Sequence, residues 1–155
     1  MQGRLIHSIP HFLVLALGIL IFALIHPLLA VAYSVVVIAS TVYFLKYICT
    51  RCASYGSKFC PSGYGILSGK LFPRNRDITF RKAFKRHIWA VAVQWFLPLG
   101  AGIAWIVKGL PDMDWILIAT MMIFIIVAFV WLPIASRHKG CDVCPQRKDC
   151  PFKGK

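Results

Sequence analysis

Residues 5–45 contain no Lys, Arg, Asp or Glu. At about 1.5 Å of rise per residue, a helix of this length would be roughly twice as long as one bilayer crossing requires. We therefore predict a helical hairpin with spans at 9–25 and 28–45, divided at His26-Pro27 because proline favours the first turn of a helix. The alternative is a secretory signal cleaved near Ala30-Val31-Ala32, but Tyr33 to Leu45 would then be too short to span.

Two further runs without formal charge, residues 87–107 and 115–136, predict a second hairpin with spans at 88–107 and 115–134. The turn between them is expected at residues 108–112, where Gly109 and Pro111 favour a chain reversal. With 59% hydrophobic and only 15% charged residues, the chain is more apolar than a soluble domain. We expect residues 1–155 to form a single all-α integral membrane domain of four transmembrane helices.

The basic residues are distributed unevenly along this predicted topology. Ten Lys or Arg fall in the loop 46–86, six in the tail 135–155 and one at Arg4, whereas Lys108 alone falls in a hairpin turn. The positive-inside rule therefore predicts that both termini, the loop and the tail are cytoplasmic, in a cytoplasmic (inner) membrane. Sidedness also accounts for the net charge of +13 without invoking nucleic acid, for which no recognition motif is present.

A basic segment precedes the third predicted span. Phe80 and Phe84 are four residues apart and would share one helical face, while the Lys and Arg residues between and after them could meet anionic lipid headgroups. We expect an interfacial helix over residues 78–86. A solvated basic loop that merely follows the positive-inside rule is the competing interpretation.

All six cysteines fall in two similar motifs, each of which follows a predicted hairpin. The first is Cys49-x2-Cys52-x7-Cys60-Pro61, and the second is Cys141-x2-Cys144-x5-Cys150-Pro151. Structural disulfides are uncommon in a reducing cytoplasm, so these compact groups favour thiolate binding of a metal. The repeated order suggests two halves in the same orientation, whose cysteines would meet beneath the bundle.

The motifs leave the metal open. Cys-Pro steps, basic neighbours and a scarcity of carboxylates favour one or two iron–sulfur clusters on the six cysteines, although neither motif has the usual Cys-x2-Cys-x2-Cys run. Zinc is the alternative cofactor, either in a four-thiolate site that joins the two motifs or with His138 and the second triplet. Thiol redox chemistry, or cysteines that bind nothing, is a third possibility.

These observations predict a membrane-embedded metal protein that transfers electrons to or from a membrane partner or a quinone. The rival is a zinc-stabilised scaffold or assembly subunit without catalysis. Either would present its basic surface to anionic headgroups and to a protein partner or a second copy. Export thiol oxidoreductases are disfavoured because their thiols face the oxidising side, and a metal transporter because no cysteine or carboxylate lies within a span.

Two histidines lie at the cytoplasmic ends of predicted spans. His11 is near the start of the first span and His87 directly precedes the third. Either residue could ligate a haem or contact a quinone. Histidine at a membrane interface more often serves as an amphipathic boundary residue, and this is the interpretation we favour.

Overall fold

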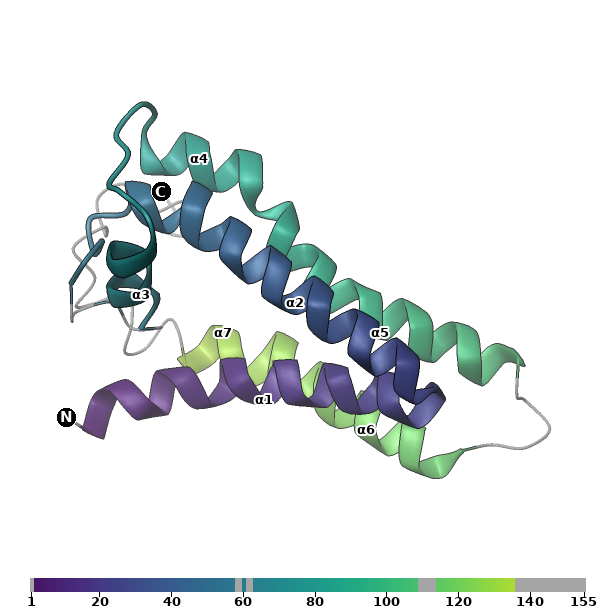
Figure 1. Ribbon diagram of the computed structural model, residues 1–155. Helices are drawn as coiled ribbons and strands as arrows, with labels where there is room; N and C mark the ends of the chain where they lie inside the picture. The colour runs from purple at the N-terminus through teal and green to yellow at the C-terminus, as the bar shows by residue number, and fades with distance from the viewer. Residues whose placement is uncertain (1, 58–59, 61–62, 109–113, 136–155) are drawn as a thin grey trace.

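The computed structural model describes residues 2–57, 60, 63–108 and 114–135, and every element in these ranges is helical (Figure 1). The all-α prediction is therefore confirmed for this part of the chain. In chain order the elements are α1 (Gln2–Ile25), α2 (Pro27–Tyr47), the short 3-10 helix η1 (Cys49–Arg51), α3 (Tyr64–Leu71), α4 (Phe80–His87), α5 (Trp89–Lys108), α6 (Trp115–Ile125), the π-helical segment η2 (Ile126–Trp131) and α7 (Leu132–Ala135).

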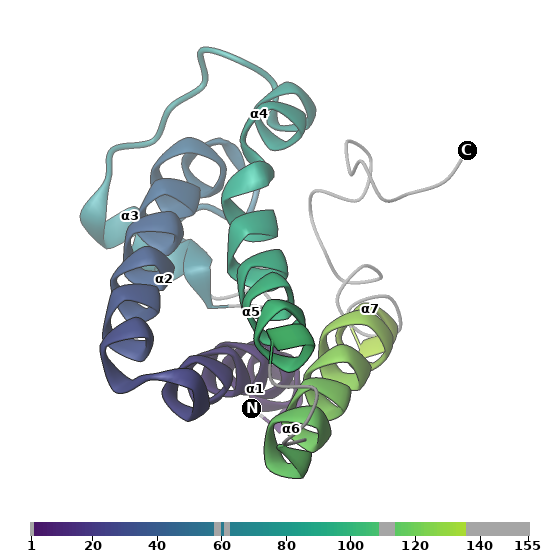
Figure 2. The same cartoon turned by 90° about the vertical axis from the view of Figure 1, so that its right-hand side faces the viewer.

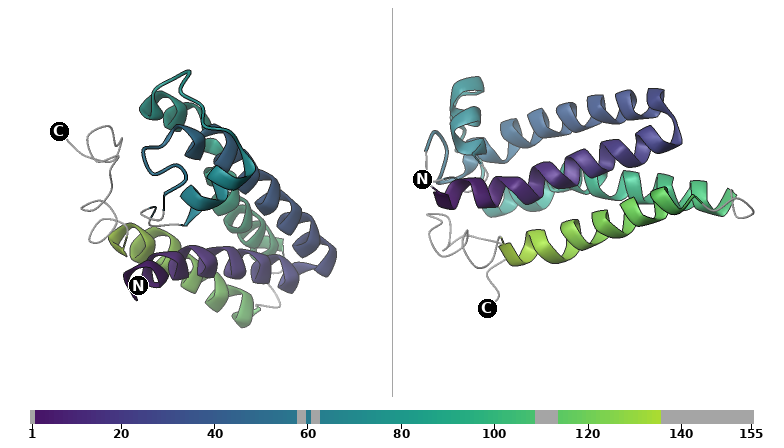
Figure 3. Two further views of the ribbon diagram at one scale, coloured as in Figure 1. Left: turned by 60° about the vertical axis from the view of Figure 1, so that its left-hand side comes forward. Right: turned by 90° about the horizontal axis from the view of Figure 1, so that it is seen from below.

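The long helices α1, α2, α5 and α6 alternate in direction along the chain (Figure 1). Helix α1 contacts each of the other three, and α2 also contacts α5. The start of α1, the short helix α3 and the end of α7 lie at one end of the molecule, which also carries Cys49 and which we call the cysteine end (Figures 1 and 3). The turn between α1 and α2, the end of α5 and the start of α6 lie at the opposite end, which we call the turn end (Figure 1).

Three helical stretches are long and apolar enough to cross a membrane: Pro27–Arg51, Phe80–Lys108 and Trp115–Ile134. In α1, a shorter apolar stretch covers Ile9–Ile25. Large apolar side chains are also exposed along these helices, as expected of surfaces that face lipid rather than water. The most exposed are Leu28, Trp115, Ile116, Ile38, Phe12 and Val31.

The predicted helix boundaries have clear local causes. His26 has an extended backbone and its Nδ1 accepts a hydrogen bond from the Leu28 N–H at 3.2 Å, so it caps α2, which begins at Pro27. Asp114 caps α6 in the same way, accepting hydrogen bonds from the N–H groups of Ile116 and Leu117. The predicted turn at 108–112 lies outside the described residues after Lys108.

Helix α6 continues into a π-helical segment that the sequence analysis did not predict. The Leu132 N–H bonds to the carbonyl of Val127, five residues earlier, rather than four. The next residue, Pro133, has no N–H, and its ring would clash with the carbonyl four residues before it. The wider π turn accommodates that proline without ending the helix.

The basic segment before α5 is helical, as predicted. Helix α4 covers Phe80–His87, close to the expected 78–86, and the rings of Phe80 and Phe84 pack with centroids 5.8 Å apart. Ile88 alone separates α4 from α5. The position of α4 at a membrane interface remains a prediction.

Candidate functional site

The first cysteine triplet lies at the cysteine end, directly after α2. Cys49 begins η1 and is buried, whereas Cys52, which ends it, and Cys60 are half-buried. The Cys52 N–H bonds to the Cys49 carbonyl at 3.2 Å, and the Thr50 hydroxyl donates to the Lys46 carbonyl at 2.6 Å. These bonds hold two thiol-bearing residues, Cys49 and Cys52, in one tight turn that follows α2.

Helix α3 supports the loop between Cys52 and Cys60. The Gly56 N–H bonds to the Gly65 carbonyl at 2.9 Å. A β-carbon built on Gly65 would clash with the Ser54 carbonyl oxygen and lie 2.9 Å from Cys60 Cβ, and one on Gly69 would lie 2.9 Å from Gly56 Cα. Two glycines four residues apart therefore give α3 a bare face on which the cysteine loop can lie.

Tyr64, the first residue of α3, joins the cysteine loop to α1. Its hydroxyl is hydrogen-bonded to His11 Nε2, and its ring packs edge-on against the histidine with centroids 5.5 Å apart. Burial, followed by the nearby thiols of Cys49 and Cys60, raises the pKa of Tyr64 to about 12. The hydroxyl is therefore protonated at neutral pH and acts as a hydrogen-bonding anchor.

The described residues include no group of three or more His, Cys, Asp or Glu side chains placed to hold a metal ion. The second triplet, Cys141, Cys144 and Cys150, and His138 lie outside the described residues. The predicted meeting of the two motifs therefore remains a prediction. Helix α7 ends at Ala135 on the cysteine end, so the chain enters the second motif from the same end that carries the first (Figure 1).

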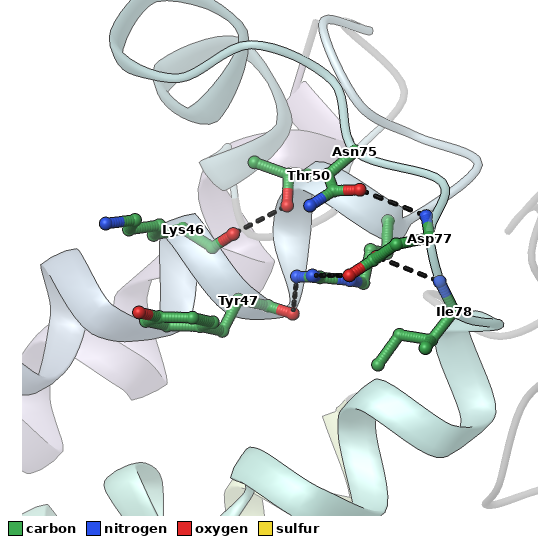
Figure 4. Close-up of polar contacts among 7 residues, drawn as sticks. Lys46, Tyr47, Thr50, Asn75, Asp77 and Ile78 are labelled. Atoms are coloured by element: carbon green, nitrogen blue, oxygen red, sulfur yellow. Dashed lines mark hydrogen bonds and ion pairs between the residues drawn. The ribbon is translucent and has the colours of Figure 1, made fainter.

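An ion pair fixes the chain that follows the cysteine loop. Arg51 Nε and Nη2 donate to the two carboxylate oxygens of Asp77 at 2.8 and 2.9 Å, and Nη1 donates to the Tyr47 carbonyl at 2.7 Å (Figure 4). The hydrogen bond from Arg51 is the main cause that lowers the pKa of Asp77. Because the folded-state pKa is lowered, the pair stabilises the fold at neutral pH and is lost as pH falls through that value.

His87 lies among aromatic side chains where α4 meets α5. Its Nδ1 is hydrogen-bonded to the Tyr43 hydroxyl at 2.7 Å, and its ring stacks on Tyr47 with centroids 5.0 Å apart. The indole of Trp89 packs against Tyr43 on the other side. Tyrosine and tryptophan gather in this way at membrane interfaces, so the arrangement is consistent with the boundary role favoured for His87.

The structure also places a polar cluster between α2 and α5 that the sequence analysis missed. Gln94 is buried, and its Nε2 lies 2.6 Å from Ser40 Oγ, 3.1 Å from Thr41 Oγ1 and 3.3 Å from the Val37 carbonyl oxygen. The Tyr33 hydroxyl donates to the Gln94 backbone carbonyl at 2.6 Å. The sequence did contain a signal for this cluster, because Gln94 is an amide within a charge-free run. In lipid such a side chain needs a hydrogen-bond partner on a neighbouring helix.

Comparisons of the chain with protein-family models, with curated proteins and with solved structures found no match.

Proposed function

We propose that this chain crosses the membrane four times and holds a thiolate-ligated metal centre at its cysteine end, on the cytoplasmic side. The proposal rests on the ends of α2 and α7, which lie at the same end of the molecule (Figure 1). Cys49 directly follows α2, and α7 leads toward the second motif at the same end of the molecule (Figure 1). Thiolates from both triplets would then meet beneath the helices, as in a site shared by two halves of a protein.

The surroundings of the first triplet support ligand binding. The loop is held on α3 by backbone contacts, which would keep the thiols in place when no metal is bound. Ser54 Oγ is buried and has no hydrogen-bond partner within the described ranges, so the loop offers one further polar group to a bound centre. The basic chain around the motif would offset the negative charge of a thiolate-ligated centre.

We favour an iron–sulfur centre that exchanges electrons with a membrane partner or a quinone. The Cys-Pro steps and the scarcity of carboxylates support this assignment, and the basic surface of the cysteine end would attract an acidic electron carrier. The centre would lie beside the start of α1 and the end of α2, close enough to the membrane for exchange with a lipid-soluble acceptor. His11 and His87 are hydrogen-bonded to Tyr64 and Tyr43, and we assign them no ligand role.

A zinc-stabilised scaffold is the second candidate, because Cys49 is buried within the packing of the cysteine end. Zinc bound by four thiolates, or by the second triplet with His138, would stabilise the fold instead of carrying electrons. Under this alternative, metal removal would unfold the cysteine end and release whatever partner it recruits.

Anaerobic purification followed by metal analysis and electron paramagnetic resonance separates the two candidates. The iron–sulfur proposal predicts a brown protein with broad visible absorption and reducible iron, and the scaffold predicts a colourless protein with stoichiometric zinc. Cys49→Ser should lower the bound metal, whereas the control Ala53→Ser adds a hydroxyl to the same loop without removing a thiol. A protein that binds neither metal, or whose metal content is unchanged by Cys49→Ser, would refute the proposal.

The orientation requires its own measurement. Arg81 is exposed on α4 and is not a proposed metal ligand, so a cysteine can be introduced there. In the variant Arg81→Cys, a membrane-impermeant maleimide should label this position in inverted vesicles and leave it unlabelled in intact spheroplasts, because the basic loop is predicted to be cytoplasmic. Labelling from the outside would overturn the proposed topology and, with it, the assignment to a reducing compartment.

A further inference from the structure

A hollow of about 400 Å³ lies beside the ion pair at the cysteine end. One wall is the turn after α2 and the other is the chain that leads into α4, so the hollow is formed by segments more than twenty residues apart in sequence. Its lining combines arginines with apolar and hydroxyl side chains: Arg51, Ala53, Arg74, Arg76, Asp77, Ile78, Thr79 and Phe80.

The ion pair between Arg51 and Asp77 joins the two walls of this hollow, and the other arginines give its lining a positive charge. Arg51 is only 6% exposed, and both of its terminal nitrogens and Nε donate to Asp77 or to the Tyr47 carbonyl (Figure 4). These two residues therefore neutralise each other and hold the walls together. Arg74 and Arg76 remain, so the lining carries a net charge of about two positive units at neutral pH.

Arg74 and Arg76 are exposed and available to a ligand. The Arg74 guanidinium lies 5.7 Å from the centre of the Tyr55 ring, and the Tyr55 hydroxyl is anchored to the Phe72 carbonyl at 2.6 Å. Across the described parts of the chain, the only ion pair is the one between Arg51 and Asp77. Arg74 and Arg76 have no carboxylate partner among the described residues, and their two guanidinium groups form a suitable donor set for a phosphate.

The position of the hollow relative to the predicted membrane interface favours a lipid as the source of that phosphate. Tyr43, Tyr47 and Trp89 form an aromatic group of the kind that marks a membrane interface. Arg51 follows Tyr47 by about one helical turn, roughly 6 Å, which is about the thickness of one headgroup layer. Helix α4 continues from the hollow with its Phe80 and Phe84 rings packed together, an apolar surface that acyl chains could meet.

We propose that this hollow binds the phosphate of an anionic phospholipid headgroup, held by Arg74 and Arg76. The proposal rests on the membrane topology proposed above and not on the metal centre, so lipid binding and metal content can fail independently. It differs from diffuse attraction because it assigns the interaction to two arginines and not to the basic surface as a whole.

Lipid binding to the full chain in detergent can be measured by native mass spectrometry with phosphatidylglycerol, phosphatidylcholine or inorganic phosphate. The double variant Arg74→Gln/Arg76→Gln should weaken phosphatidylglycerol binding roughly 10- to 30-fold. The matched control Lys46→Gln/Lys70→Gln also removes two positive charges, from α2 and α3 outside the hollow, and should retain binding within about threefold. Phosphatidylcholine should bind much more weakly than phosphatidylglycerol.

Equal losses in the two double variants would overturn the proposal, because they would show diffuse attraction. Equal binding of phosphatidylcholine would overturn it too, as would inorganic phosphate that binds as tightly as phosphatidylglycerol. Circular dichroism checks that each variant is folded. If the glutamine variant is not folded, Arg74→Lys/Arg76→Lys decides: it keeps the charge but loses the guanidinium fork, and a binding loss of severalfold is expected, whereas unchanged binding counts against the site.

Discussion

Two helix interfaces in this molecule are packed by different means. Between α1 and α6 with η2 lies a buried cluster of apolar side chains: Val14, Ile21, Leu117, Met121, Phe124, Val127 and Ala128. Between α2 and α5, the buried side chains of Gln94 and Tyr33 form hydrogen bonds across the interface. Figure 2 shows the two helix pairs from the turn end.

The two interfaces differ mainly in how they fix the alignment of the helices along their axes, and less in how strongly they hold the helices together. In lipid, apolar side chains gain little from leaving the solvent, so helix association depends on close packing and on hydrogen bonds between helices. Removing a large side chain from a packed apolar interface lowers the free energy of unfolding, because the cavity that remains is filled only in part. A hydrogen-bonded interface has few alternative alignments, because a shift along the helix axis would separate Gln94 from Ser40 and Thr41.

The largest effect is expected from the apolar interface. Phe124 is fully buried, so Phe124→Ala should lower the free energy of unfolding by about 3–5 kcal/mol. Unfolding in mixed micelles of increasing denaturing detergent measures the change. On the same helix, Ile123 is half exposed, and Ile123→Ala should cost about 1 kcal/mol or less. Equal costs at the two positions would mean that α1 and α6 do not pack as described.

A smaller effect tests the contact between α1 and α2 that places Tyr33. A β-carbon on Gly18 would lie 2.7 Å from Tyr33 Oη, so Gly18→Ala should push the ring from its place and cost about 1–3 kcal/mol. Adding Tyr33→Phe removes that oxygen, and the double variant should be more stable than the sum of the single changes predicts. Gly100→Ala is the control, because no atom lies within 4 Å of the added carbon. Simple additivity would contradict the close approach.

Much of the helical framework could be predicted because its determinants are local. The charge-free runs and the division at His26-Pro27 depend only on neighbouring residues, and α2 begins where that proline predicted. The helix before α5 followed from the four-residue spacing of Phe80 and Phe84. The number of membrane crossings and the sidedness remain predictions, since they depend on a bilayer as well as on the chain.

The arrangement of the candidate site depends on contacts between distant segments and could not be predicted. The hydrogen bond of Tyr64 with His11 joins residues 53 positions apart, and no sequence pattern pairs them. Helix α3 went unpredicted because its glycines weaken the helical signal, although Gly65 and Gly69 are the residues that admit the cysteine loop. The second cysteine motif lies outside the described residues, so its part in the site remains a prediction.

The smallest effect, and the sharpest test of the comparison, concerns Gln94. Gln94→Leu keeps the side chain's approximate size but removes the donors to Ser40 and Thr41, and should lower the free energy of unfolding by about 1 kcal/mol. The control is Thr120→Val on α6, where the buried hydroxyl donates only to the Ile116 carbonyl of its own helix. That change should be nearly neutral, because it breaks no bond between helices.

Register provides the second readout for Gln94→Leu. Cysteine pairs introduced across α2 and α5 should crosslink at one alignment in the parent protein. In the double variant Gln94→Leu/Tyr33→Phe, which also removes the Tyr33 bond to the Gln94 backbone carbonyl, they should crosslink at several. A variant that keeps a single crosslinking pattern and loses no stability would show that apolar packing alone aligns both interfaces. The contrast between them would then be one of composition and not of mechanism.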